Sequence, residues 1–388
     1  MFGRFITTRW ALVFLFLFLT GCGGAGSTLA PMSRQPSTTT PESQIISEAL
    51  AALRPEDRLG DLVVFANGQI YATSDAVRAT AQYYQPTSDP DVYLDASGTP
   101  IEFPPLIDDP SLMPSGSRSV DAGEGAGTGL SHRWYSDQGY SYMSADVSIP
   151  CGSSQLNGTT TDVNGGPLPL QAGYIYGGGI SARGLAADVG IQFNARPGKI
   201  DSPKSVQEFI RAQKPADKPV GAYHLTCDVT YQLTSYVTEI GGVPNLVDVL
   251  QMDGDEQTHT MIEAMNPTKV SGWSKVCGLC RTKRVTSLAV TPPGQQQTIV
   301  GTWFGVQQPY AKKPLPTITW RGAVQSYFSS STAESPVPPI PWSEGQGVSK
   351  GGDTPTDGTT TGVFVLIRHD RSNETIGINE SGPQLIVK

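Results

Sequence analysis

The sequence has few positive charges and no apolar run long enough to cross a bilayer. Its 388 residues carry 27 lysines and arginines against 35 aspartates and glutamates, for a net charge of −8 at pH 7. A protein that binds nucleic acid needs a basic surface to meet the phosphates, so we do not expect a nucleic-acid partner. The longest apolar run, Trp10 to Leu19, has ten residues, about half of the ~20 that a spanning helix requires.

Several catalytic signatures are also missing. The sequence has no Walker A motif, no His-Glu-x-x-His zinc motif, and no Glu-x-Asp-x-x-Glu strand pattern of the kind found in one large family of β-jelly-roll glycosidases. An acid peptidase of the sandwich type would need a glutamate–glutamine pair, for which Gln192 and Glu263 are candidates. No two strand carboxylates have a spacing that indicates a catalytic pair, so we interpret each as a solvated polar residue. They are Asp146, Asp188, Asp228, Asp248, Glu239 and Glu263.

The N-terminal segment is typical of an export signal. Arg4 and Arg9 precede the apolar run, and Leu19-Thr20-Gly21-Cys22 follows it. A basic segment, an apolar run of this length and a cleavage site with small residues together form a signal peptide. The LTGC sequence resembles the lipobox of bacterial lipoproteins. The resemblance implies that residues 1–21 are removed, that Cys22 carries the lipid, and that the protein is anchored in the bacterial cell envelope, outside the cytoplasm.

The alternative is an ordinary secretory signal that is cut elsewhere.

Loss of Arg4 and Arg9 with the signal would take the number of basic residues from 27 to 25 against 35 acidic residues, so the mature chain would have a net charge of −10. Residues 22–40 are rich in Gly, Ser, Thr and Pro, a composition that predicts a flexible tether between the anchor and the folded part.

The first part of the mature chain predicts a small α+β unit over residues 41–103. Apolar residues recur at helical spacing over 41–53 and 74–84. Two hairpins are indicated, one over 62–73 with Asn-Gly at its tip and one over 92–103 with Ser-Gly. The Pro-, Gly- and Asp-rich residues 104–129 indicate a linker.

Residues 130–388 predict a mainly β fold, an antiparallel β-sandwich of jelly-roll type. About ten strand-like stretches are separated by turn signals. In residues 223–239, Tyr231, Leu233 and Val237 fall on one face and threonines on the other. The exception is residues 202–213, which predict a helix on the outside. Residues 329–361 predict a long loop in which Trp342 follows a proline-rich stretch and could belong to an arm that covers a ligand.

Four cysteines remain once Cys22 is assigned to the lipid: Cys151, Cys227, Cys277 and Cys280. An even number in an exported protein favours disulfides, and we favour Cys151–Cys227 with Cys277–Cys280 only slightly over the other pairings. A redox site at Cys277 and Cys280 has basic neighbours of the right kind, but it lacks the strand and long helix that should surround such a motif. A zinc site would need two further ligands with suitable spacing. We therefore expect no metal or cofactor.

Aromatic residues provide the clearest indication of a ligand. Flat aromatic faces stack on sugar rings and are common at protein interfaces, although most tryptophans in strands pack in a core. The turn at residues 252–257 concentrates acidic side chains without EF-hand spacing, and weak calcium binding there stays open. The tryptophans that we consider as ligand-binding candidates are Trp273, Trp303, Trp320 and Trp342.

Three functions follow from these observations. The first is a surface lipoprotein whose sandwich is a non-catalytic binding or adhesion module for a glycan, an envelope polymer or an envelope protein. The second is a secreted hydrolase of glycans or peptides, which requires two carboxyls, or a carboxyl and an amide, in one cleft. The third is an envelope thiol-disulfide redox protein that uses Cys277 and Cys280.

Overall fold

The computed structural model describes most of the chain beyond residue 40. It covers residues 41–86, 92–94, 96, 98, 100–102, 129–148, 159–162, 167–169, 172–194, 206–211, 220–226, 229–265, 271–289, 308–309, 317–350, 359–360, 364–378 and 386–387. The predicted signal peptide and tether lie outside these residues, as do Cys22, Cys151, Cys227, Asp228 and Trp303. Within the described part, no helix combines the length and the apolar character that a membrane span requires.

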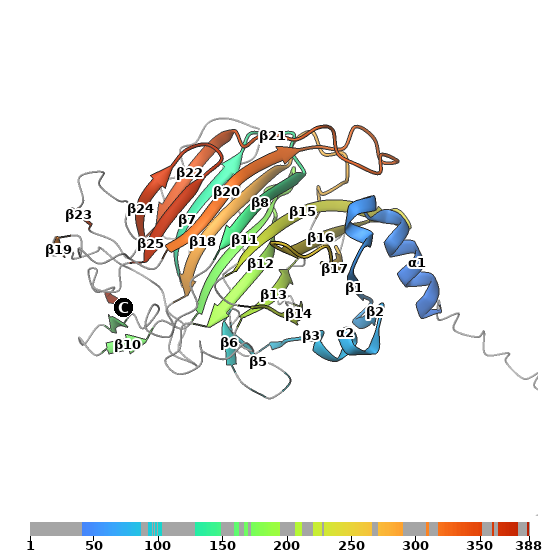
Figure 1. Cartoon of the computed structure of the whole chain (residues 1–388), viewed down its shortest axis with the longest axis horizontal. Helices are drawn as coiled ribbons and strands as arrows, with labels where there is room; N and C mark the ends of the chain where they lie inside the picture. The colour runs from blue at the N-terminus through green and yellow to red at the C-terminus, as the bar shows by residue number, and fades with distance from the viewer. Residues whose placement is uncertain are drawn as a thin grey trace, which may run out of the picture. The chain divides into compact units, whose positions relative to one another are not determined.

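The described chain is mainly β, and most of its strands belong to two large sheets (Figure 1). The ten-stranded sheet has the order β2-β1-β17-β16-β15-β8-β20-β25-β24, with β21 paired to β20. Its strands are β1 (Asp61–Ala66), β2 (Gln69–Ala72), β8 (Tyr142–Ser148), β15 (Thr230–Ile240), β16 (Val243–Met252), β17 (Thr258–Ala264), β20 (Thr317–Ser326), β21 (Ile340–Pro341), β24 (Phe364–His369) and β25 (Glu374–Ile378).

The eight-stranded sheet has the order β22-β7-β18-β11-β12-β13-β14-β3. Its strands are β3 (Gln82–Tyr83), β7 (Gly129–Ser136), β11 (Ala172–Ile180), β12 (Ala186–Asn194), β13 (Val206–Arg211), β14 (Val220–His224), β18 (Arg281–Ala289) and β22 (Glu344–Lys350). Three small sheets complete the described strands: β4 (Gln85–Pro86), β5 (Val92–Leu94) and β6 (Pro100–Glu102); β9 (Thr159–Asp162), β10 (Pro167–Pro169) and β26 (Ile386–Val387); β19 (Gln308–Pro309) and β23 (Thr359–Thr360).

The two large sheets share one hydrophobic core. Met143 and Leu233 of the ten-stranded sheet lie in the same buried cluster as Ile175 and Val189 of the eight-stranded sheet. The sheets come especially close at Gly177, where an added Cβ would lie 2.7 Å from the Sδ of Met143. Strand alternation puts Tyr231, Leu233 and Val237 in this core, as the sequence predicts. A mainly β architecture with two sheets is therefore confirmed.

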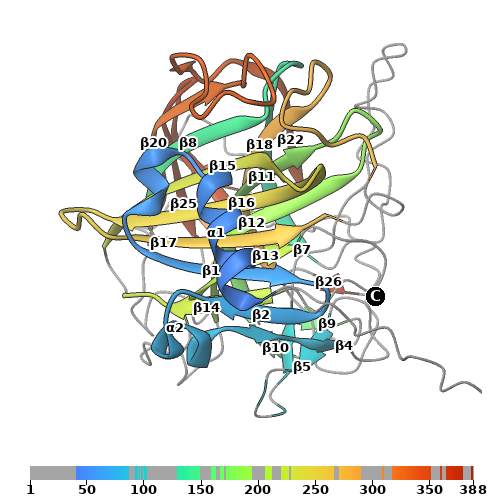
Figure 2. The ribbon, with the colours of Figure 1, turned by 90° about the vertical axis from the view of Figure 1, so that its right-hand side faces the viewer.

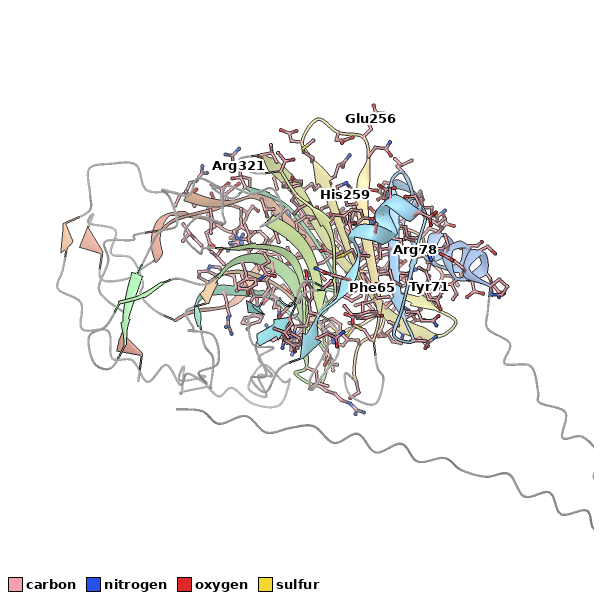
Figure 3. All side chains as sticks on the ribbon, turned by 90° about the horizontal axis from the view of Figure 1, so that it is seen from below. Phe65, Tyr71, Arg78, Glu256, His259 and Arg321 are labelled. Atoms are coloured by element: carbon pink, nitrogen blue, oxygen red, sulfur yellow. A yellow bond between two sulfur atoms is a disulfide. The ribbon has the colours of Figure 1, made fainter. Side chains whose placement is uncertain are left out.

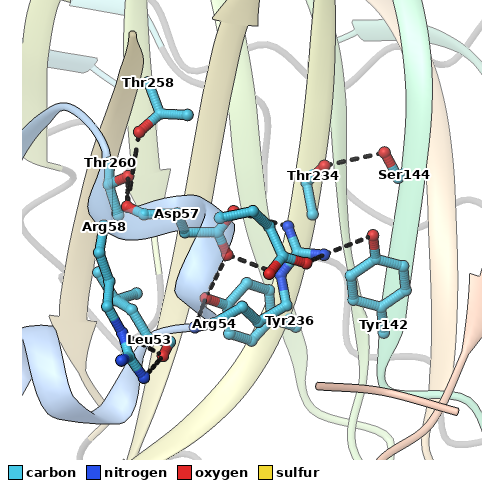
Figure 4. A network of polar contacts seen from close by, with 11 residues as sticks. Leu53, Arg54, Asp57, Arg58, Tyr142, Ser144, Thr234, Tyr236, Thr258 and Thr260 are labelled. Atoms are coloured by element: carbon cyan, nitrogen blue, oxygen red, sulfur yellow. Dashed lines mark hydrogen bonds and ion pairs between the residues drawn. The ribbon is translucent and has the colours of Figure 1, made fainter. Parts of the chain in front are cut away.

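The other face of the ten-stranded sheet is covered by helix α1 (Glu42–Ala52) and the short 3-10 helix η1 (Pro55–Arg58) (Figure 2). Arg54 and Asp57 are both buried, and two hydrogen bonds of 2.7 and 2.6 Å join the guanidinium to the carboxylate. Tyr236 donates to Asp57 over 2.7 Å, and Arg54 donates to the hydroxyl of Tyr142 over 3.0 Å (Figure 4). This network fixes the first helical segment to β15 and β8.

The sequence predicts a separate unit over residues 41–103, but the structure joins this segment to both large sheets. Strand β1 pairs with β17 in parallel, and β3 pairs with β14. Residues 41–388 accordingly form one compact unit. Both predicted hairpins are present: β1 and β2 connect through Asn67 and Gly68, which have positive φ angles, and β5 pairs with β6. Helix α2 (Asp75–Thr80) confirms the second predicted helix, with Ser74 as its N-cap.

The helix predicted over residues 202–213 is wrong. Residues Val206–Arg211 form strand β13, which pairs with β12 on one side and β14 on the other. Ile210 is buried in the shared core. Two ladders of hydrogen bonds and this burial outweigh the local helical preference. The long loop predicted over 329–361 also contains the strands β21 and β22.

Candidate functional site

A cavity of about 100 Å³ opens at one end of the two sheets. Strands β15 and β16 supply Tyr231, Leu250 and Met252 to its walls, and β17 supplies His259. Asp255 and Gln257 come from the turn that joins β16 to β17, and Thr226 follows β14 of the other sheet. The cavity therefore brings together residues that are far apart in the sequence.

The acidic turn between β16 and β17 has a defined geometry. Gly254 adopts a φ of 80°, which favours glycine, and Asp255 N–H donates to Met252 O over 3.0 Å. The Asp255 carboxylate accepts the backbone N–H of Gln257 over 2.9 Å, and Gln251 donates to Asp255 O over 2.7 Å. These bonds hold the side chains of Asp255 and Gln257 at the cavity.

Tyr231 fixes the opposite wall. Its hydroxyl accepts the N–H of Thr226 over 2.7 Å and donates to the carbonyl oxygen of Thr226 over 3.0 Å. Both bonds are made to the backbone, so the hydroxyl of Thr226 is not needed to hold this wall. Leu250 and Met252 add an apolar surface between the polar groups.

His259 connects the two sheets at this end of the molecule. Its ring stacks on Tyr223 of β14, with ring centroids 4.2 Å apart and planes inclined by 9°. Tyr223 has a φ of 50°, an uncommon and costly conformation for a residue with a large side chain. Figure 3 shows His259 on its strand near the turn that carries Glu256, whose side chain points away from the protein.

The protonation state of His259 follows from its surroundings. Burial lowers the pKa of His259 below its ordinary value, although the nearby carboxylates of Asp61 and Asp255 oppose this shift. The imidazole is therefore neutral near pH 7 and has one donor and one acceptor nitrogen. Its Nδ1 atom is buried and has no hydrogen-bond partner among the residues that the structure describes.

The chemistry of the cavity suits a small polar ligand. The residues that line it offer two hydroxyls, an amide, an imidazole and one carboxylate beside an apolar surface. A water-sized group needs roughly 10–15 Å³ of such space, so the volume fits a ligand of about the size of one sugar ring. A glycosidase of the usual kind needs two carboxylates, and among the described residues that line this cavity Asp255 supplies one.

The tryptophans that the sequence singles out do not form an exposed platform where the structure describes them. Trp320 and Trp342 are fully buried, and Trp273 is 7% exposed. Trp320 donates its indole N–H to Thr286 over 3.1 Å, and the guanidinium of Arg284 lies 5.6 Å from the ring of Trp342. These three residues belong to the shared core, and Trp303 lies outside the described residues.

The carboxylates that we interpret as solvated are in part buried. Asp188, Asp248 and Glu263 are at most 3% exposed, and Asp188 forms a buried ion pair with Lys283. Glu263 lies on the same face of β17 as Met261 and therefore faces the shared core. Gln192 neighbours the core residue Ile191 and so lies on the opposite face of β12. The structure does not bring Gln192 and Glu263 together as a peptidase pair.

One further pattern concerns the hydrolase alternative. Gly347, Ser349 and Gly351 have the Gly-x-Ser-x-Gly spacing of a nucleophile elbow. Such a serine sits on a sharp turn from a strand to a helix, whereas Ser349 lies within β22 and pairs with His132 of β7. The local structure therefore does not support a role for Ser349 as a nucleophile.

Cys277 and Cys280 form a disulfide with Cα atoms 5.4 Å apart. Cys280 is fully buried, and its carbonyl oxygen accepts the N–H groups of Gly139 and Tyr140, so the bond stabilises the loop that leads into β18. Among the described residues, no group of three or more His, Cys, Asp and Glu side chains is close enough to hold a metal ion.

The sequence contains a weak signal for the site. The acidic turn at residues 252–257 stands out, but nothing in the sequence shows that His259, Tyr231 and Thr226 converge on it. From the sequence, Tyr231 and His259 look like ordinary residues of two separate strands. Their convergence depends on strand register and on the loop after β14.

Comparisons with known proteins add little to this geometry. No protein-family model matches the chain, and no curated protein matches it. Among solved structures, the chain is similar to "Peanut lectin with 9mer peptide (PVIWSSATG)", with 12% identity over 60% of this chain and 89% of that chain. The TM-score is 0.18, a value too low to support a conclusion about fold or function.

Proposed function

We propose that the protein is a lipid-anchored protein of the bacterial envelope whose β-sandwich, of jelly-roll type, binds a saccharide without cleaving it. The lipobox at residues 19–22 and the tether that follows support the anchor. The cavity lined by Asp255, Gln257 and His259 supports the binding function, and its composition is the observation that carries the proposal. The polymer to which the sugar belongs would be a component of the envelope or its surroundings.

The cavity suits a sugar for specific reasons. Sugars present hydroxyls that both donate and accept hydrogen bonds, and the carboxylate, amide, hydroxyl and neutral imidazole groups of the cavity offer both kinds of partner. Sugars also have an apolar ring face, which Leu250 and Met252 can contact. The described residues that line the cavity include one carboxylate rather than the pair that hydrolysis requires, which favours binding.

The redox alternative has less structural support. Cys277 is 6% exposed and Cys280 is fully buried, whereas a thiol that exchanges with a partner must be accessible to it. The disulfide instead holds a loop against Gly139 and Tyr140. We therefore assign it a structural role.

Titration of the purified protein with a panel of envelope and extracellular oligosaccharides tests the binding function. We expect saturable binding of at least one sugar, and we expect Gln257→Ala to weaken it about 3- to 10-fold, the equivalent of one lost hydrogen bond. The turn should survive this change because only the backbone N–H of Gln257 holds it.

Glu256→Gln provides the matched control. Glu256 neighbours Gln257 in the same turn but does not line the cavity, so its substitution should leave the affinity within about twofold. If no sugar in the panel binds saturably, or if Gln257→Ala binds as tightly as the wild type, the proposed site is wrong.

A further inference from the structure

The surroundings of the cavity are negatively charged. Asp255 lines it, Asp253 and Glu256 lie in the same turn, and Asp61 pairs with His259 across the β1–β17 ladder. Among the described residues that line the cavity there is no lysine or arginine. Asp146 of β8 lies near Asp253 and also interacts with Arg321 of β20.

Two polar atoms of residues that line the cavity have no protein partner where the structure describes the chain. The Asp255 carboxylate uses Oδ1 to accept the Gln257 N–H, and no protein donor meets its Oδ2. His259 has a buried Nδ1 without a hydrogen-bond partner. A buried imidazole nitrogen left unpaired has an energetic cost. The Oδ2 atom of the exposed Asp255 is accessible to a donor group on a ligand.

We propose that the cavity selects a saccharide that carries a free amino group over the same saccharide in its N-acetylated or acidic form. This inference rests on the proposed function. A protonated amine offers three donors and a positive charge to Asp255, and hydrogen bonds between charged groups are about twice as strong as neutral ones. A sugar carboxylate would instead be repelled by Asp255, Asp253 and Asp61.

The neutral state of His259 is part of this selectivity. A protonated imidazole in the cavity wall would repel an ammonium group, but burial keeps the pKa of His259 below its ordinary value. Tyr223 holds the ring in place by stacking. His259 therefore adds no positive charge to the cavity wall near pH 7.

The test compares glucosamine oligosaccharides with N-acetylglucosamine oligosaccharides and uronic-acid oligosaccharides of the same length. We expect the protein to bind the free-amine form about tenfold or more tightly than the N-acetylated form at low ionic strength. The preference should shrink as salt is added, because salt screens the charges.

Asp255→Asn is the decisive variant, since the asparagine oxygen can still accept the Gln257 N–H and keep the turn. It should remove most of the preference for the free amine while leaving some affinity for the N-acetylated sugar. Glu256→Gln should keep the preference. Equal affinity of the wild type for both sugar forms would overturn this inference and leave the proposed function standing. The absence of saturable binding to any sugar would overturn both.

Discussion

At the scale of single residues, the contact between Tyr223 and His259 is the most unusual feature of the site. Tyr223 adopts a positive φ that few large residues adopt, and its ring stacks on the partly buried imidazole of His259. Strain of this kind persists only where the surrounding structure imposes it. Because the two residues come from different sheets, their stacking also sets how the sheets meet beside the cavity.

The partial burial of His259 predicts a dependence of stability on pH. Its pKa is lowered in the folded protein below the ordinary value of 6.5, so the unfolded chain takes up a proton first as the pH falls. The free energy of unfolding should therefore drop as the pH falls through about 6.5. In His259→Phe, which keeps a ring for the stack with Tyr223, this part of the drop should be absent in urea unfolding at several pH values. Parallel pH profiles for the two proteins would refute this explanation.

The sequence is a poor guide to the environment of single side chains in this fold. Both faces of the ten-stranded sheet are buried, one by the other sheet and one by α1, so strand alternation does not distinguish solvent from core. Asp248 and Glu263 therefore look like solvated residues in the sequence although they are buried. The sequence around Trp320 and Trp342 does not show whether these side chains are exposed or buried. The packing of the two sheets places both of them in the core.

At the scale of elements, η1 is attached to the ten-stranded sheet through the buried Arg54–Asp57 ion pair, because Arg54 also bonds to Tyr142 and Asp57 to Tyr236. Removing one partner of such a pair leaves the other charge unpaired, at a cost of about 3–5 kcal/mol. We therefore expect Asp57→Ala to lower the free energy of unfolding by about this amount, because it leaves the Arg54 guanidinium with no buried carboxylate. Urea titration monitored by circular dichroism measures the effect.

Glu56→Gln is the matched control for this change. Glu56 also forms an ion pair with Arg54, at 2.9 Å, but its side chain is 52% exposed. Surface pairs contribute about 0–1 kcal/mol, so this substitution should have little effect. Equal destabilisation by the two substitutions would show that burial of the Arg54–Asp57 pair is not what holds the segment.

The loop closed by the Cys277–Cys280 disulfide is a second element that can be tested. The bond spans a sequence separation of only 3, so it constrains the unfolded chain weakly. We expect the double variant Cys277→Ser/Cys280→Ser to lose about 2 kcal/mol of stability and to keep its sugar binding. Opening of this bond by a dilute dithiol while the fold remains intact would contradict the structural role and favour a redox function.

Elements are predictable where the local sequence determines them. The Asn67-Gly68 turn predicts its hairpin because few other residues adopt the required φ angles, and Ser74 is a strong N-cap signal for α2. Strand β13 is different, because its sequence has helical character and its strand state depends on pairing with β12 and β14. The parallel pairing of β1 with β17 joins segments nearly 200 residues apart, and no local pattern indicates it.

At the scale of the whole molecule, composition and turn spacing correctly indicate a mainly β chain, and the structure resolves it into two large sheets. The extent of the fold is less predictable. The first helices and strands belong to the same compact unit as the rest, because α1 covers one face of the ten-stranded sheet and β1 extends it. The cavity also depends on how the whole molecule folds, since its walls come from both sheets.

The proposed anchor is a property of the whole chain that can be tested in bacteria. If Cys22 carries the lipid, metabolic labelling with a radioactive or clickable fatty acid should modify the wild-type protein and leave Cys22→Ala unlabelled. A smaller share of the variant should fractionate with membranes, because it lacks the lipid and its apolar run of ten residues is shorter than a spanning helix. Fatty-acid labelling of Cys22→Ala would contradict the anchor.

The most direct measurement of the central claim is an NMR titration that follows the imidazole signals of the histidines. The chain has four histidines, and the spectrum of His259→Phe identifies the signal of His259. With glucosamine oligosaccharide added to the wild type, we predict that the His259 signal shifts saturably while the signals of His132 and His369 stay in place. Saturable binding that leaves the His259 signal unchanged would contradict the account, because the sugar would then bind elsewhere on the protein.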